Sequence, residues 1–180
     1  MVGKYIKKYG PGDKIRPFMG LPEIDRSVLY GLLEHAKKKT IKGVFIDTDT
    51  YNEIDDQFAL VHALLSQQFH SAIDVVAIGA APFHAPVRKT KDYSHGMELS
   101  YEEIHNILEI LDCGWDGPTY KGSTLTMKQN DGKPITNESS VALCELANNH
   151  YSENDPLFIL ALGALTNIAS AILMDPDIRS

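Results

Sequence analysis

Three short apolar runs, each followed by a segment with helical periodicity, constrain the fold of this 180-residue chain most strongly. The runs are GVFIDTD from Gly43, AIDVVAIGAA from Ala72 and PLFILAL from Pro156. Apolar runs of this length are typical of strands that are buried on both faces of a sheet. The alternation of strands and helices predicts an α/β fold, with an open, mostly parallel sheet flanked by helices.

After the first apolar run, four helices are predicted from apolar residues that recur three and four positions apart. In residues 54–68 the predicted core-facing side chains are Phe58, Val61, Leu64 and Leu65. A second helix is predicted to begin at Ser100, because Ser100 and Glu103 have the spacing of a capping box. The other two helices are predicted at 138–151 and 166–174.

The start of the chain has a different composition. Residues 1–26 are rich in Gly, Pro, Lys and Asp and predict an irregular arm. Residues 27–180 are then predicted to form one α/β domain, which opens with a helix over 27–39 whose N-cap is Ser27.

Charge and cysteine content exclude several kinds of partner. A net charge of −7 without a basic stripe argues against a nucleic-acid partner. The two cysteines are far apart and have no Cys-x-x-Cys spacing, which is typical of a reducing compartment. Because neither a signal peptide nor a membrane-spanning apolar run is recognisable, we expect a cytoplasmic protein without a membrane partner.

Acidic residues crowd the segment that follows the first apolar run. DTDTYNEIDD, residues 47–56, contains four aspartates and one glutamate. Carboxylates at this density repel one another unless a cation offsets the repulsion. Helix capping and the helix dipole account for Asp55 and Asp56 at a helix start. They do not account for Asp47 and Asp49 at the end of a strand.

Polar segments also follow the other two runs, APFH from Ala81 and LGALTN from Leu162. The carboxyl ends of parallel strands lie at one edge of a sheet, where ligands bind. We therefore expect all three segments to converge on one crevice.

Two alternative interpretations of the acidic segment fit less well. In a helix–loop–helix calcium loop that begins at Asp47, the glycine position is Asn52 and the glutamate position is Phe58, so the motif fails. A haloacid-dehalogenase-type phosphatase, which uses magnesium, also has Asp-x-Asp after a strand. That fold needs an acidic pair after a later strand, whereas FILALGALTN contains no acid. The phosphatase remains a less favoured alternative.

The acidic segment resembles the N-terminal signature of the inosine–uridine-preferring nucleoside hydrolase family. The family's usual form is D-x-D-P-G-x-D-D, and the form here, D-T-D-T-Y-N-E-I-D-D, has a turn two residues longer. LGALTNIASAI followed by Asp-Pro resembles the family's second, Gly-Gly-Leu-Thr-Asn-Ile-Ala type signature. The resemblance covers residues 42–178. It implies a nucleoside-hydrolase-like fold with a Rossmann-like core, of which this chain would be the N-terminal part, truncated on its C-terminal side.

The resemblance also implies an activity, the calcium-dependent hydrolysis of the N-glycosidic bond of ribonucleosides to free base and ribose. Asp49 would be both the catalytic base and a calcium ligand. Asp56 and the backbone carbonyl of Leu162 would be further calcium ligands. Asp55 would accept a hydrogen bond from a ribose hydroxyl, and Asp47 would orient the loop from behind. Carboxylate and carbonyl oxygens are the ligands that calcium prefers.

Three further residues are predicted to contact the substrate. His84 falls where the family usually has an asparagine near the ribose. Glu98 lies in the predicted loop before the helix at Ser100, where the family gathers substrate contacts, and Asn167 belongs to the second signature. Trp115 is predicted to be a packed turn residue rather than a platform for the base.

One further function, from a different class, stays open at this point. The chain could keep the family fold as a catalytically inactive ligand-binding or assembly module. A truncated domain would leave an open sheet edge and an exposed helix face, which favour association, so a homo-oligomer is expected.

Overall fold

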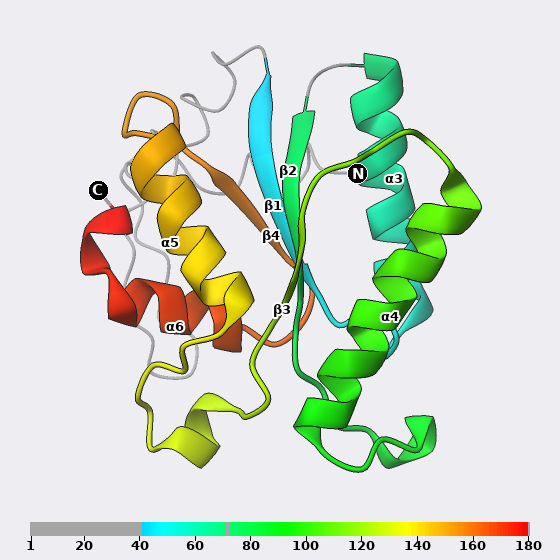
Figure 1. The fold of residues 1–180 in the computed structure, drawn as a ribbon, viewed down its shortest axis with the longest axis vertical. Helices are drawn as coiled ribbons and strands as arrows, with labels where there is room; N and C mark the ends of the chain where they lie inside the picture. Colours follow the sequence, from blue (N-terminus) through cyan, green and yellow to red (C-terminus); the bar gives the residue numbers. More distant parts are fainter. Residues whose placement is uncertain (1–40, 71–72, 180) are drawn as a thin grey trace, which may run out of the picture. The chain divides into compact units, whose positions relative to one another are not determined.

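A four-stranded parallel sheet with helices on both faces forms the described part of the chain (Figure 1). The computed structural model describes residues 41–70 and 73–179. The predicted arm (1–26) and the predicted helix (27–39) lie outside these residues. The strands are β1 (Lys42–Thr48), β2 (Ile73–Ala80), β3 (Thr119–Lys121) and β4 (Phe158–Ala161). The α-helices are α3 (Ile54–His70), α4 (Tyr93–Leu111), α5 (Glu138–His150) and α6 (Thr166–Met174), and the short 3₁₀ turns are η1 (Pro86–Arg88), η2 (Met127–Asn130) and η3 (Pro176–Arg179).

The order of the strands places a change of winding direction beside β1. The order across the sheet is β3-β2-β1-β4, so the chain moves outward from β1 to β3 and then returns to the other side of β1. The carboxyl ends of β1 and β4 therefore flank the point at which the strand order reverses. In open α/β sheets, this point is where ligands bind.

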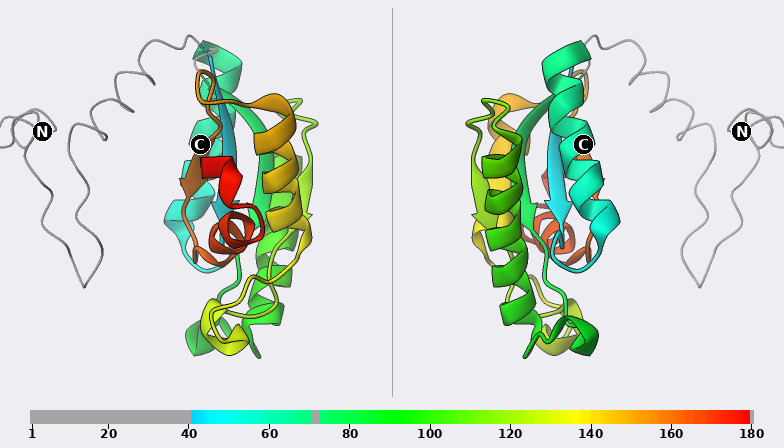
Figure 2. Two further views of the ribbon diagram at one scale, coloured as in Figure 1. Left: turned by 90° about the vertical axis from the view of Figure 1, so that its left-hand side faces the viewer. Right: turned by 90° about the vertical axis from the view of Figure 1, so that its right-hand side faces the viewer.

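Each face of the sheet has its own hydrophobic core because successive side chains of β1 point to opposite faces. Val44 and Ile46 pack with α3 and α4, whereas Phe45 packs with α5 and α6. The two views of Figure 2 look onto one helix layer each. The ladder between β1 and β2 skips Val76, so that two residues of β2 oppose one of β1 at this bulge. Beyond the bulge, Ile78 is again on the face of Ile46.

The predicted α/β class and parallel sheet are confirmed, and α5 and α6 agree with their predicted ranges. Trp115 is confirmed as a packed residue, because its Nε1–H donates to the carbonyl of Val75 at 2.8 Å and its ring packs against the first core. That carbonyl lies toward the amino end of β2, away from the edge where ligands bind.

Two predictions about the second helix were wrong. α4 begins at Tyr93 rather than Ser100, and its N-cap is Asp92, whose side chain accepts from the backbone N–H of His95. Ser100 is a fully buried residue inside the helix. Glu98 therefore lies on a helix rather than in a loop. The Ser-x-x-Glu spacing misled because a helix interior can contain the same residues by chance.

Two other features differ from prediction. β3 occupies three residues of a segment that glycine and proline made look like a turn. In α3 the buried apolar side chains are Leu60, Ala63 and Leu64, while Phe58 is 66% exposed. The sequence of α3 is apolar on more than one side, so periodicity alone left open which side faces the sheet.

No helix in the described ranges is both long enough and apolar enough to cross a membrane.

Two phenylalanines give a matched test of this fold. Phe45 is 0% exposed at the centre of β1, so Phe45→Ala should lower the free energy of unfolding by about 3–5 kcal/mol through lost burial and the cavity left behind. Phe58→Ala removes the same atoms from an exposed site and should change it by about 0.5 kcal/mol or less. Urea unfolding followed by circular dichroism measures both changes. Equal losses of unfolding free energy would contradict the assigned burial of Phe45 and exposure of Phe58.

Candidate active site

The carboxyl ends of β1 and β4 are joined directly, as the predicted crevice requires. The carbonyl of Asp47 accepts from the backbone N–H of Leu162 at 2.8 Å and of Gly163 at 3.3 Å. A Cβ on Gly163 would lie 2.9 Å from both the backbone nitrogen and the Oδ1 of Asp49. Only glycine allows so close an approach of the two chains. Leu162 is therefore held next to the acidic segment.

Asp47 is a buried carboxylate held from the α5–α6 side of the sheet. Its Oδ1 accepts from the side-chain amide of Asn167 at 2.9 Å and from the hydroxyl of Ser139 at 3.4 Å. Its Oδ2 is buried and has no hydrogen-bond partner among the described residues. An ionised carboxylate in this position is costly, because one oxygen has lost water without gaining a donor.

Asn167, at the start of α6, joins the ends of three strands. Its Nδ2 donates to Asp47 and also to the carbonyl of Ala80 at the end of β2, at 3.1 Å. Its Oδ1 accepts from the backbone N–H of Ser123, just beyond β3, at 2.8 Å. Both amide protons are engaged and the side chain is fully buried. In this arrangement Asn167 supports Asp47 and has no free amide proton for the predicted substrate contact.

Asp49 lies in the turn between β1 and α3 and is bonded within that turn. Its Oδ2 accepts from the side-chain Nδ2 of Asn52 at 3.0 Å, and its carbonyl accepts from the backbone N–H of Asn52 at 2.7 Å. The lengthened turn thus folds Asn52 back onto the predicted catalytic base.

Asp56 is brought to the same place by the first turn of α3. Its Oδ1 accepts from the hydroxyl of Thr48 at 2.7 Å, and that hydroxyl is also 3.1 Å from the hydroxyl of Thr50. Thr48 is the middle residue of Asp-Thr-Asp and points to the α3 side because side chains alternate along a strand. The two extra residues of the turn therefore do not separate Asp56 from the end of β1.

Burial raises the pKa of all three carboxyl groups. Loss of water raises the pKa of Asp47 to about 7, against the opposing hydrogen bonds from Asn167 and Ser139. Loss of water and the neighbouring charge of Asp56 raise the pKa of Asp49 to about 6. The pKa of Asp56 is also raised, by burial first and then by the charge of Asp55. In the described part of the chain, no basic side chain is among the groups that shift these pKa values.

Asp49 and Asp56 supply two carboxylates, and the backbone of the segment after β4 passes close to Asp49 at Gly163. The donor set consists of oxygen atoms only, which suits calcium rather than a metal that prefers nitrogen or sulfur. The buried Oδ2 of Asp47, which lacks a donor, fits a site that is completed by a cation. A group of three or more His, Cys, Asp or Glu side chains placed to hold a metal is not found within residues 41–70 and 73–179. The predicted calcium site therefore stays a prediction.

The other predicted site residues lie around this centre in different states. Asp55 is exposed in the first turn of α3. His84, four residues beyond β2, is exposed and places its Nδ1 3.0 Å from the hydroxyl of Thr90. Glu98 is paired with Lys121 at the end of β3, at 2.6 Å. The structure shows no contact between these three side chains and Asp49.

Four residues of the site were not predicted from the sequence: Thr48, Asn52, Ser139 and Arg88. The position of Thr48 between two aspartates was a usable signal, because strand alternation puts it on the opposite face. Ser139 carried no signal, since it approaches Asp47 from 92 positions away. Arg88 contacts Asn52 from η1, a contact that local sequence does not indicate.

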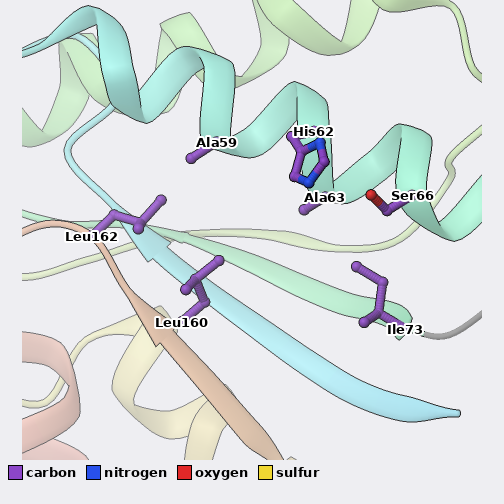
Figure 3. A pocket seen from close by; sticks show the side chains of 7 residues that line it. All are labelled: Ala59, His62, Ala63, Ser66, Ile73, Leu160 and Leu162. Atoms are coloured by element: carbon purple, nitrogen blue, oxygen red, sulfur yellow. The ribbon is translucent and has the colours of Figure 1, made fainter. Parts of the chain in front are cut away.

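An apolar pocket of about 560 Å³ lies between α3 and β4, away from the carboxylates except at Leu162 (Figure 3). Among the described residues, the edge strand β4 pairs with β1 alone. The lining of the pocket is Ala59, His62, Ala63, Ser66, Ile73, Leu160 and Leu162. With a single histidine as its titratable group, this pocket lacks the acidic chemistry of the candidate site.

Comparisons with known proteins agree with the fold. Neither a family model nor a curated protein matches the chain. Among solved structures, a protein described as "Inosine-Guanosine Nucleoside Hydrolase (IG-NH)" superimposes with a TM-score of 0.52 and 19% identity. The match covers 78% of this chain and 44% of that chain, so this chain spans less than half the length of that hydrolase. At this identity the likeness shows the fold alone, and it confirms the predicted nucleoside-hydrolase-like α/β architecture.

The raised pKa of Asp47 predicts how stability depends on pH without metal. The folded state holds this proton up to about pH 7, whereas the unfolded state releases it near 3.8. The free energy of unfolding should therefore fall as pH rises between these values, because the folded state binds more protons there. The shift corresponds to roughly 4 kcal/mol. In Asp47→Asn this part of the fall should be absent.

Urea unfolding at several pH values with a chelator present measures the effect. Glu109→Gln, which neutralises an exposed carboxylate that is not among the groups shifting the pKa of Asp47, Asp49 or Asp56, is the matched control and should keep the wild-type slope. Identical slopes for wild type and Asp47→Asn would contradict the assigned burial of Asp47.

Proposed function

We propose that this chain belongs to a hydrolase that cleaves the N-glycosidic bond of ribonucleosides. In this hydrolase the chain would bind calcium and supply the general base. One observation carries the proposal. Three buried carboxylates, Asp47, Asp49 and Asp56, lie at and just beyond the end of β1, where the strand order reverses, and no basic side chain among the described residues shifts their pKa values. The nucleoside-hydrolase-like fold supports the choice of reaction, and the proposal rests on the resemblance for its substrate class.

Asp49 would act as the general base. A carboxyl group whose pKa lies near 6 is mostly ionised at neutral pH, yet it accepts a proton more readily than an ordinary aspartate. Its carboxylate would take a proton from the attacking water. A bound calcium ion would supply Lewis acidity that makes this water more acidic.

Asp56 and the carbonyl of Leu162 would hold the ion together with Asp49. Thr48 donates to one oxygen of Asp56, which leaves the other oxygen of that carboxylate for a ligand. Leu162 is held beside Asp49 by its backbone hydrogen bond to Asp47. Asp47 would thus act from behind, by fixing the loops that present the ligands.

The sugar would be recognised at the exposed rim. Asp55 would accept a hydrogen bond from a ribose hydroxyl, and its position at the N-terminal end of α3 keeps its carboxylate beside that of Asp56. His84 and Glu98 are further proposed contacts, and Glu98 would have to exchange its pairing with Lys121 for a hydroxyl. Cleavage would pass through an oxocarbenium-like ribosyl centre, as in other glycosidases.

The remaining expectations belong to the same proposal. We expect a ribonucleoside as the ligand, no nucleic acid or membrane as a partner, a cytoplasmic location and a homo-oligomeric state. The outer edge of β4, which has no strand partner among residues 41–70 and 73–179, and the apolar pocket beside this strand support association.

Calcium binding is the first test, because the proposed ligands belong to this chain. Calorimetry should show a calcium-binding event, and Asp49→Asn and Asp56→Asn should each raise the Kd about tenfold or more, since each removes a charged ligand. Glu109→Gln is the matched control, because it removes an exposed carboxylate that is not among the groups acting on Asp49 or Asp56, and it should leave the Kd unchanged. The absence of calcium binding by the wild-type protein would contradict the metal part of the proposal.

Hydrolysis is the second test, with inosine and uridine as substrates and free ribose as the measured product. Asp49→Asn should lower the rate of ribose release by about 10²–10⁴-fold, the usual contribution of a general base. Glu109→Gln should not lower this rate. Ribose release that survives Asp49→Asn would show that Asp49 is not the base.

The same assays separate the alternatives. An inactive ligand-binding or assembly module would bind neither calcium nor ribose through these carboxylates and would release no ribose. A phosphatase would instead release phosphate from an aryl phosphate when magnesium is present.

A further inference from the structure

The lengthened turn between Asp49 and α3 is held from outside by η1. The Nε of Arg88 donates to the backbone carbonyl of Asn52 at 2.6 Å. The two residues are 36 positions apart, so this bond joins the segment that follows β2 to the segment that follows β1. An arginine that binds the main chain of a neighbouring loop limits the positions that the loop can adopt.

Asn52 transmits this restraint to Asp49. Its backbone N–H donates to the carbonyl of Asp49 at 2.7 Å and closes the turn. Its side-chain Nδ2 donates to Oδ2 of the same residue at 3.0 Å. The other carboxylate oxygen, Oδ1, faces Gly163. With one oxygen bound to Asn52 and the other beside β4's end, the plane of the carboxylate is fixed.

The loop that carries Arg88 is itself braced. The buried hydroxyl of Thr90 accepts from the backbone N–H of Ala85 at 2.9 Å and lies 3.1 Å from the carbonyl of Ala85, to which it donates. The backbone N–H of Lys89 closes η1 by donating to Pro86. Arg88 is therefore presented from a closed loop, which makes its contact with Asn52 part of the fold.

We propose that Arg88 and Asn52 are positioning residues of the candidate site, with Arg88 fixing Asn52 and Asn52 fixing the carboxylate of Asp49. The inference deepens the proposed function, on which it rests for the role of Asp49. Fixing a reacting group in one orientation before substrate arrives is a general source of catalytic efficiency and of metal affinity. The longer turn thus has a role in the site, because it accommodates Asn52, which binds the carboxylate of Asp49.

A positioning role and a purely electrostatic role predict opposite results. Arg88 is a cation near a carboxylate cluster, so electrostatics alone predicts that its removal tightens the binding of a second cation. Positioning predicts that removal of Arg88 weakens binding, because the carboxylate of Asp49 is then free to rotate. Calcium calorimetry on the full 180-residue chain separates the two.

The variants are Arg88→Met, Arg88→Lys and Asn52→Ala, and Met is chosen because it keeps the apolar stem without any donor. We expect Arg88→Met and Asn52→Ala to raise the calcium Kd about three- to tenfold, the range expected for loss of one hydrogen bond. Arg88→Lys keeps a donor and should restore an affinity close to wild type. Lys91→Ala removes an exposed cation from the same loop and is the matched control for charge, with no expected rise in Kd.

A second measurement does not need calcium. In the metal-free protein, hydrogen exchange of the side-chain amide protons of Asn52, followed by NMR, reports whether this group is held. Arg88→Met should speed this exchange about tenfold, as expected when one hydrogen bond is lost, whereas Arg88→Lys and Lys91→Ala should not. Asp49→Asn should also change the amide signal of Asn52, because it replaces the acceptor of this bond.

The two readouts distinguish failure of the inference from failure of the proposed function. If wild type binds calcium and Arg88→Met leaves or lowers the Kd, positioning by Arg88 is refuted. If wild type binds no calcium, the metal proposal fails, and the exchange measurement alone decides the positioning. Unchanged exchange in Arg88→Met overturns the inference in either case. Because Arg88 is exposed, its substitution should leave the fold intact, which a thermal melt checks.

Discussion

The buried hydrogen bond between the carboxylate of Asp47 and the amide of Asn167 holds together the edge of the sheet at which the candidate site lies. The same amide group binds the end of β2 and the segment beyond β3, while the backbone carbonyl of Asp47 binds the segment beyond β4. All four strand ends are therefore connected through two residues. A polar connection of this kind in a dry environment is strong only when its members are satisfied, and Asp47 retains one oxygen without a donor. The oxygen without a donor makes ionisation of Asp47 costly, in agreement with the pKa that burial raises to about 7.

Strand geometry explains how one short segment carries two tasks. Side chains alternate along β1, so Asp47 points to the α5–α6 side and Thr48 to the α3 side. Asp47 thereby joins the strand ends, and Thr48 binds the first turn of α3 by donating a hydrogen bond to Asp56. Asp49 lies in the turn beyond the strand. In the Asp-Thr-Asp sequence, the first aspartate thus supports the strand ends, the threonine links β1 to α3, and the second aspartate is the proposed reacting group. The longer turn that follows is tolerated because Thr48 fixes Asp56 independently of the turn's length.

The predictability of each element followed from how local its cause is. α6 was predicted to the residue, because its apolar sequence is bounded by a threonine and an Asp-Pro pair. β3 was missed, because three residues next to glycine and proline become a strand only by pairing with β2. The start of α4 was misplaced, because Asp92 and Ser100 both resemble N-caps and only the fold selects between them. Phe58 was placed in the core because α3 is apolar on several sides.

For the candidate site, the sequence by itself determined which groups are available: a cluster of carboxylates after one strand, a Leu-Gly pair after another, and the alternation that predicts a parallel sheet. Residue type and spacing along the chain are local properties, so they can be read without a structure. Only the tertiary structure decided that Asn167 donates to Asp47, that Ser139 of α5 approaches the same carboxylate, and that Arg88 binds Asn52. These contacts join residues that are far apart in the chain, and they exist because the strand order returns β4 to the side of β1.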